Sequence, residues 1–344
     1  MVATTYPIWL TDVKDSLKAF RTADSVTKFY DTGRLSKLYF DKEGTTYLGK
    51  AGFDKAVNVA LAYEQAVSVC RTDLEKGNMR LADADSQLHQ LSGDAYIFAR
   101  LFSLSGWAFY YYKRKQTEKA ISFTLEGLNI SEYLERRGHR ILIYRRFEQH
   151  NNLATILFKT NRELEGATLL SGIIELLVAQ QTQKLFGGGW DLQAVQHVSY
   201  ISELSIDGFV SVAAKHLIEA GASGYKCTEA DLFTVLFDQL PNIEATTQNR
   251  AIIYNWLYLK RAFFAGDVKI FCQGVSEFMQ EDLDISFDLL KLSLLQNLLL
   301  LITKETGLIN SSIHYELVSY VHQSIKLLKP FDYLKKLVTT PYSA

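Results

Sequence analysis

The chain has 344 residues, of which 48% are hydrophobic and 22% are charged, and its formal net charge is −1. This composition is typical of globular proteins and excludes a disordered chain. The near-zero charge removes the electrostatic argument for binding to nucleic acid or to an anionic membrane, so we expect neither partner. The length exceeds that of one usual hydrophobic core, which indicates two domains or an elongated stack of repeats.

Proline and cysteine are both scarce, with four prolines and three cysteines in the whole chain. Because proline costs roughly 3 kcal/mol inside a helix, its scarcity favours long helices. The cysteines, Cys70, Cys227 and Cys272, lie far apart and form no CxxC pair, and the first residues carry no recognisable secretion signal. We therefore expect a reducing compartment and a cytoplasmic location.

The N-terminal part of the chain alternates between helical patterns and a polar stretch. Apolar residues at helical spacing predict helices over residues 8–30 and 56–74, and a shorter helix within residues 76–91. The glycine-bearing stretch at residues 31–52 is interpreted as a polar loop, in which residues 38–40 are the segment most similar to a strand.

The central part of the chain shows the clearest pattern. Helices are predicted over residues 94–113 and 117–136, and again over residues 141–159 and 162–183. Only a few residues separate the members of each pair. Connections this short require antiparallel neighbours, so the pattern predicts two helical hairpins.

Further helices are predicted after the three glycines at positions 187–189. They cover residues 192–203, 208–220, 229–239, 247–264, 268–279, 285–304, 313–328 and 331–338. The last of these is short and is interpreted as a tail helix that caps the preceding pair. In terms of domains, we expect a helical segment at 1–92, hairpins at 93–186 and further hairpins at 187–344, joined in one continuous stack.

The most apolar window is residues 283–302. A helix that spans a bilayer needs about 20 mainly apolar residues, but Asp288, Lys291 and Asn297 interrupt this window. We therefore interpret it as a deeply buried core helix and expect no membrane insertion.

Bulky, small, aromatic and small residues follow one another at a characteristic spacing in the first central hairpin: Trp107, Ala108, Tyr111 and Ala120, with Gly127 at a later small position. On these residues the hairpin at 101–133 resembles a tetratricopeptide repeat.

Two further units keep part of this pattern. Residues 146–178 keep Phe158 and Ala167, and a unit that begins at Tyr254 keeps a glycine turn at Gly266. The resemblance implies an all-α fold, namely an α-α superhelix of stacked antiparallel helical hairpins (a tetratricopeptide-like solenoid). Independently of it, each hairpin has more apolar surface than it can bury alone, so neighbouring hairpins are expected to stack.

One motif suggests nucleotide binding. The sequence GTTYLGK, from Gly44 to Lys50, has the glycine and lysine spacing of a phosphate-binding loop. Ala51 follows, where such a loop needs serine or threonine to hold magnesium, and no alternation of strands and helices surrounds it. We interpret the motif as a glycine-bearing loop.

The histidines, cysteines and acidic residues form no recognisable catalytic or metal-binding pattern. The chain has no ExxH motif, no GxSxG motif and no cysteine–histidine pairing that spacing reveals. The sequence therefore predicts a non-catalytic protein with no cofactor and no metal.

A cluster of arginines is the most distinctive polar feature. Five lie within eleven residues: Arg136, Arg137, Arg140, Arg145 and Arg146. The planar guanidinium group suits the recognition of carboxylates or phosphates. The alternative is that these arginines pair with nearby glutamates on a solvated helix face. The candidate glutamates are Glu132, Glu135, Glu148 and Glu163.

Arg145, Gln149 and Asn152 recur at helical spacing and share one face. The family resemblance implies that Gln149 and Asn152 line a concave groove that binds extended peptides. An asparagine amide can clamp a peptide backbone through one donor and one acceptor. The same register adds Phe102, Ser105, Phe109 and Tyr112 from the preceding unit. The predicted site residues are Arg140, Arg145, Gln149, Asn152, Phe109 and Tyr112, and the alternative for the aromatic pair is packing between helices.

The predicted function is a non-catalytic helical-repeat scaffold that binds a peptide or a partner protein in this groove. A regulatory protein that senses a peptide or another ligand is the alternative. An all-α enzyme with an unrecognised site is the third hypothesis. The sequence leaves the oligomeric state open.

Overall fold

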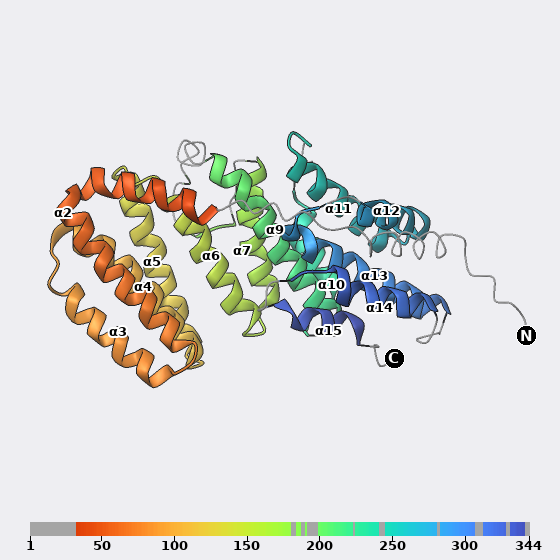
Figure 1. Cartoon of the computed structure of the whole chain (residues 1–344), viewed down its shortest axis with the longest axis horizontal. Helices are drawn as coiled ribbons and strands as arrows, with labels where there is room; N and C mark the ends of the chain where they lie inside the picture. The colour runs from red at the N-terminus through yellow and green to blue at the C-terminus, as the bar shows by residue number, and fades with distance from the viewer. Residues whose placement is uncertain are drawn as a thin grey trace, which may run out of the picture. The chain divides into compact units, whose positions relative to one another are not determined.

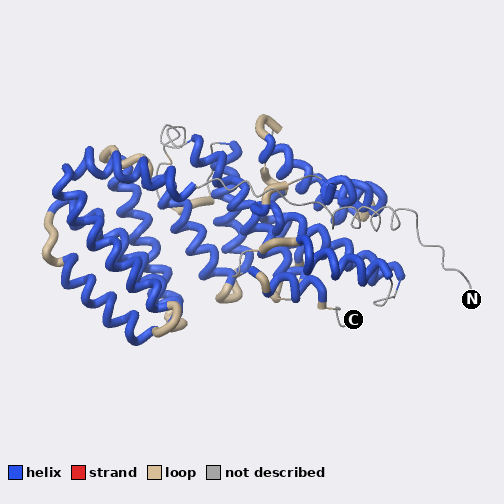
Figure 2. Tube along the Cα trace, viewed as in Figure 1, coloured by secondary structure: helices blue, strands red, loops and turns tan. Residues whose placement is uncertain are grey.

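The computed structural model describes residues 32–179, 184–186, 190, 199–222, 224–240, 245–280, 283–306, 312–327 and 331–340. Within these residues every regular element is a helix and no strand occurs (Figure 2). The all-α prediction is therefore confirmed, whereas the helix predicted at 8–30 lies outside the described residues.

The chain divides into two compact units. Residues 31–205 form one, called here the N-terminal unit, and residues 206–344, together with residues 1–30, form the other, called the C-terminal unit. The division falls after Ser205, whereas the sequence suggested a boundary at residue 187.

Between Thr32 and Ala179, the described part of the N-terminal unit contains six helices (Figure 1). They are α2 (Thr32–Cys70), α3 (Leu74–Leu88), α4 (Gly93–Lys113), α5 (Thr117–Arg136), α6 (Leu142–Phe158) and α7 (Glu163–Ala179). Each helix packs against the next one in the chain, and α2 also packs against α4. The two hairpins predicted from the sequence, α4–α5 and α6–α7, are both present.

The polar loop predicted at 31–52 is wrong, because α2 runs through this stretch. Residues 38–40 are accordingly helical, and the phosphate-loop-like motif lies inside the helix. Gly49 has φ 68° and ψ 157°, which kinks α2 and which glycine adopts without a steric penalty. Phe40 and Phe53, on either side of the kink, pack on each other with ring centroids 5.9 Å apart, and both contact Phe98 of α4. Burial of these rings therefore overrides a locally loop-like sequence.

Asp85 of α3 ties the first three helices together. Its carboxylate accepts hydrogen bonds from the hydroxyl of Tyr63 on α2 and from the indole N–H of Trp107 on α4, at 3.1 and 3.2 Å from its two oxygens. At the other end of the α2–α3 pair, a Cβ atom on Gly77 would lie 2.2 Å from Sγ of Cys70 and 2.8 Å from its Cα. The close approach of these helices therefore depends on glycine at this position.

The described part of the C-terminal unit is also helical. Its elements are α9 (Ser199–Gly221, which begins before the division), α10 (Glu229–Phe237), α11 (Gln248–Ala265), α12 (Val268–Gln280), the short 3₁₀-helix η1 (Ile285–Phe287), α13 (Asp288–Thr306), α14 (Ser312–Ser324) and α15 (Tyr333–Thr339). The helix break predicted between residues 203 and 208 is absent, since α9 is continuous. Gly266 ends α11 in the left-handed conformation, with φ 79°, so the predicted glycine turn between α11 and α12 is confirmed.

Helix α13 lies at the centre of this unit and packs against α11, α12, α14 and α15. Residues Ile285–Thr303, with a mean hydropathy of 1.7, are the one stretch in the described residues long and apolar enough to cross a membrane, but 78% of that window is buried within the molecule. The prediction of a buried core helix is confirmed. Its polar residues are bonded inside the core: Asn297 donates to Glu229 of α10 at 2.8 Å and accepts from the fully buried Lys260 of α11 at 2.5 Å.

Candidate functional site

A pocket of about 360 Å³ lies inside the N-terminal unit, between α2, α4 and the start of α6. Most of its wall is apolar, and four charged residues stand among the apolar ones. The apolar lining includes Phe40, Val57, Leu61 and Phe102, and the charged residues are Asp41, Glu64, Arg145 and Glu148. We call this feature the Arg145 pocket.

Three contacts hold Arg145 in the wall of this pocket. Its Nη1 donates to Glu148 at 2.8 Å, its Nη2 donates to the hydroxyl of Ser105 at 3.0 Å, and its guanidinium carbon lies 5.4 Å from the ring centroid of Phe102. Its Nε is buried and has no hydrogen-bond partner. The guanidinium is thus oriented in advance, and its hydrogen-bonding capacity is not fully used.

The charges around the pocket are predominantly negative. Asp41, Glu64 and Glu148 contribute three carboxylates against the single guanidinium of Arg145. The lining therefore has a formal charge of −2, although the whole chain carries only −1. This lining is therefore complementary to a ligand that carries a positively charged group beside an apolar group.

Helix α2 is anchored beside the pocket by a contact that sequence reasoning did not foresee. Glu43 accepts a hydrogen bond of 2.8 Å from the backbone N–H of Ile141, just before α6 begins. A carboxylate at a helix N-terminus satisfies a free donor and interacts favourably with the helix dipole. This contact joins the first segment of α2, which carries Phe40 and Asp41, to the helix that carries Arg145.

Of the six predicted site residues, only Arg145 lines this pocket, together with Phe102 from the preceding hairpin. The predicted groove position of Gln149 is wrong. Its side chain is 2% exposed and lies between α5 and α6, where its amide oxygen accepts from the hydroxyl of Ser131 at 3.0 Å. A Cβ atom on Gly127 would lie 2.6 Å from the amide nitrogen of Gln149, so the amide fills space left by this glycine.

The other four predicted site residues are dispersed. Arg140 and Asn152 are exposed, and Phe109 and Tyr112 are half-buried. The ammonium group of Lys113, one turn along α4, lies 5.6 Å from the ring centroid of Phe109. None of the four belongs to the lining of the Arg145 pocket.

The arginine cluster is largely paired, as the alternative interpretation held. Arg136 pairs with Glu132, Arg145 with Glu148, and Arg146 with Glu135 at 3.1 Å. Arg137 pairs instead with Asp94 at 3.3 Å. The first of these contacts is exposed, but the pair between Arg146 and Glu135 is fully buried.

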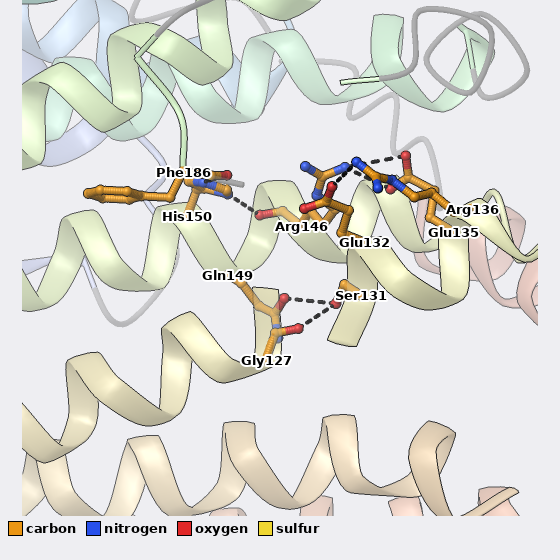
Figure 3. A network of polar contacts seen from close by, with 9 residues as sticks. All are labelled: Gly127, Ser131, Glu132, Glu135, Arg136, Arg146, Gln149, His150 and Phe186. Carbon is orange, nitrogen blue, oxygen red and sulfur yellow. Dashed lines mark hydrogen bonds and ion pairs between the residues drawn. The ribbon is translucent and has the colours of Figure 1, made fainter. Parts of the chain in front are cut away.

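Arg146 and its neighbours form a polar cluster inside the unit (Figure 3). The guanidinium carbon lies 3.8 Å from the ring centroid of Trp190, whose ring stacks on Phe147. On the next turn of α6, His150 contacts the backbone oxygens of Arg146 and Phe186 at 2.8 and 3.1 Å. Burial lowers the pKa of His150 to about 4, so the imidazole is neutral at pH 7. Sequence reasoning missed this cluster, although Arg146, His150 and the apolar Leu153 share one helical stripe.

His139, in the connection between α5 and α6, is a second buried imidazole. It is 0% exposed and stacks on Phe98, with ring centroids 5.2 Å apart and an interplanar angle of 15°. The ring centroids of Phe40 and Tyr47 lie 5.7 and 6.1 Å from that of the imidazole, and neither imidazole nitrogen has a hydrogen-bond partner. Burial lowers the pKa of His139 to about 4.

In the described part of the chain, no three histidine, cysteine, aspartate or glutamate side chains are grouped so that they could hold a metal ion. Among the sites that the structure does contain, the Arg145 pocket combines a shaped apolar cavity with a fixed, incompletely paired donor. Comparison of the chain with protein-family models, with curated proteins and with solved structures returned no match.

Proposed function

We propose that this protein is a non-catalytic helical-repeat scaffold that binds a peptide segment of a partner protein in the Arg145 pocket. The single observation that carries the proposal is a cavity that is walled by apolar side chains and contains an incompletely paired guanidinium. Binding sites for peptides and small ligands combine an apolar wall with a few placed polar groups in this way.

The order of helix packing supports a repeat architecture. Along α4, α5, α6 and α7, each helix contacts its successor, and short turns join the members of each pair. Stacks of helical hairpins such as the tetratricopeptide repeats are built from neighbour-to-neighbour contacts of this kind and present extended binding surfaces. We extend this arrangement to a superhelical stack as part of the proposal.

The pocket favours a particular kind of segment. Its volume of about 360 Å³ is at the lower end of the range for ligand sites, which suits one or two side chains better than a large cofactor. A large apolar side chain would contact Phe40, Leu61 and Phe102, and a neighbouring lysine or arginine would face Asp41 and Glu64. A remaining N–H of the Arg145 guanidinium would donate to a carbonyl of the segment.

Selection from a displayed library of random short peptides against the whole chain tests the proposal. Enriched sequences are expected to place a large apolar residue next to lysine or arginine. Their affinity is then measured by fluorescence anisotropy for wild type and for Leu61→Asp and Glu64→Lys, each of which changes an exposed pocket residue. We expect each substitution to weaken binding at least ~10-fold, which corresponds to ~1.4 kcal/mol.

Matched controls are available in the same unit. Leu164 on α7 is 45% exposed, compared with 47% for Leu61, and Asp83 is an exposed acid on α3; neither lines the pocket. Leu164→Asp and Asp83→Lys should leave affinity unchanged. A selection without this pattern, or equal losses in the pocket and control variants, would show that the pocket is not the binding site.

A further inference from the structure

Only one of the three nitrogens in the buried guanidinium of Arg146 has a hydrogen-bond partner (Figure 3). Nη1 donates to both carboxylate oxygens of Glu135, at 3.1 and 3.3 Å. Nε and Nη2 are also buried, and neither has a partner. One side of this 0% exposed side chain is therefore paired, and the other is not.

The two unpaired nitrogens form a single edge of the guanidinium. Along this edge the Nε–H and one Nη2–H point in nearly parallel directions, which is the geometry that holds two oxygens of one carboxylate or phosphate. The indole of Trp190 rests on the face of the same guanidinium, and its Nε1–H is likewise buried without a partner. The cluster thus contains three buried donors that lack an acceptor.

Buried donors without acceptors are strongly unfavourable, and more so on a charged group. We therefore expect a ligand with suitable acceptor atoms to bind the two unpaired nitrogens in the functional protein. We propose that the Nε–Nη2 edge of Arg146 is a binding site for a carboxylate, in which two oxygens of the ligand accept from this edge. Trp190 supplies a further donor in the same cluster and an aromatic face against the guanidinium.

The surrounding charges favour a singly charged ligand. Glu135 already lies against Arg146, and Glu132 is paired with Arg136 nearby (Figure 3). His150 adds no positive charge at pH 7, since burial lowers its pKa to about 4. A doubly charged phosphate would therefore meet more repulsion than a carboxylate. This site does not depend on the Arg145 pocket, because Arg146 does not belong to that lining.

Titration of the whole chain with acetate at constant ionic strength tests the site. We expect a saturable rise in melting temperature, because a ligand that binds only the folded state stabilises it. The tryptophan fluorescence should change in parallel, and this change should disappear in Trp190→Phe. Acetamide has the shape of acetate without its charge, and it should have a clearly weaker effect.

Arg146→Lys is the decisive variant. Lysine keeps a positive charge beside Glu135 but has no planar edge, so the acetate response should be lost or weakened at least ~10-fold. Arg137→Lys makes the same chemical change at an exposed arginine that pairs with Asp94, and it should respond like wild type. If Arg146→Lys does not fold, the arginine Nε–H resonances of the wild type provide a second readout, and one of them should shift saturably with acetate.

Two further titrations distinguish a peptide carboxylate from that of a free acid. A blocked tripeptide with a free C-terminal carboxylate is compared with its C-terminal amide. If the peptide acid saturates the response at a lower concentration than acetate does, and the peptide amide does not saturate it, the site is assigned to a peptide. If acetate saturates the response at a lower concentration than the peptide acid does, the site is assigned to a free acid. The proposal is overturned if acetate causes no saturable response, if Arg146→Lys responds like wild type, if acetamide equals acetate, or if inorganic phosphate saturates at lower concentration than acetate. None of these outcomes bears on the peptide selection at the Arg145 pocket.

Discussion

Replacing His139 by phenylalanine is expected to make the N-terminal unit less sensitive to acid. His139 is completely buried against Phe98, Phe40 and Tyr47, and neither ring nitrogen has a partner. Protonation would place an uncompensated positive charge in this aromatic surrounding, which burial opposes. Phenylalanine keeps an aromatic ring in the stack and removes the titrating group.

The size of the effect follows from the pKa of His139, which burial lowers from 6.5 to about 4. Because the unfolded chain binds a proton more readily than the folded chain, stability is fully present above pH 6.5 and falls as the pH drops from 6.5 towards 4. The complete loss is ~3 kcal/mol, and the part between pH 7 and pH 5 is ~2 kcal/mol. At pH 7 itself we expect only a small change, since removing unpaired nitrogens and adding ring volume have opposite effects.

The measurement is urea denaturation of wild type and His139→Phe at pH 7 and pH 5, followed by pulsed hydrogen exchange in peptides from α4. The difference in the free energy of unfolding between wild type and variant should change by ~2 kcal/mol between pH 7 and pH 5, and the variant should gain stability relative to wild type at pH 5. Other titrating groups, including His150, cancel in this comparison. His89→Phe, at the exposed residue that caps the C-terminus of α3, is the control. An identical difference at both pH values would show that His139 is not the acid-sensitive group.

Two further predictions concern packing and buried charge. Gly77→Ala should destabilise the N-terminal unit by ~1–3 kcal/mol, because its Cβ would lie 2.8 Å from the backbone of Cys70; Gly52→Ala, where the nearest neighbouring atom is 3.6 Å away, should be neutral or stabilising in the same thermal-unfolding assay. Equal effects at both glycines would contradict the packing argument. Lys260→Met should cost the C-terminal unit ~3–5 kcal/mol by leaving the Glu229 carboxylate buried without its counter-ion. Adding Glu229→Leu should recover much of this loss in a double-mutant cycle, and strictly additive losses would refute the coupling.

Much of the helical architecture could be predicted because its signals are local. Helix α5 begins at Thr117 and ends at Arg136, as the spacing predicted, and the turn at Gly266 has the left-handed backbone that glycine permits. The failure at residues 31–52 has a tertiary cause. Glycines and polar residues there favour a loop, but Phe40 and Phe53 gain enough burial against Phe98 to hold the segment in a kinked helix.

The candidate site could be predicted only in part. The tetratricopeptide-like register placed Phe102 and Ser105 on the groove side predicted for Arg145, and the structure brings these three side chains together. The same register put Gln149 on the open side of α6, whereas α5 covers it. A helical register gives the direction of a side chain but not the position of the neighbouring helix, so it cannot separate a groove residue from a buried one.

By itself, the sequence determined the helical class, the hairpin turns and the apolar character of α13, because periodicity and turn chemistry depend on residues close together in the chain. Only the tertiary structure decided which polar side chains are buried and with what partners. Arg146 meets Trp190, and Lys260 meets Glu229 and Asn297, across separations that no local pattern encodes. The physical reason is that desolvation depends on the complete set of neighbours in space, and those neighbours come from distant helices.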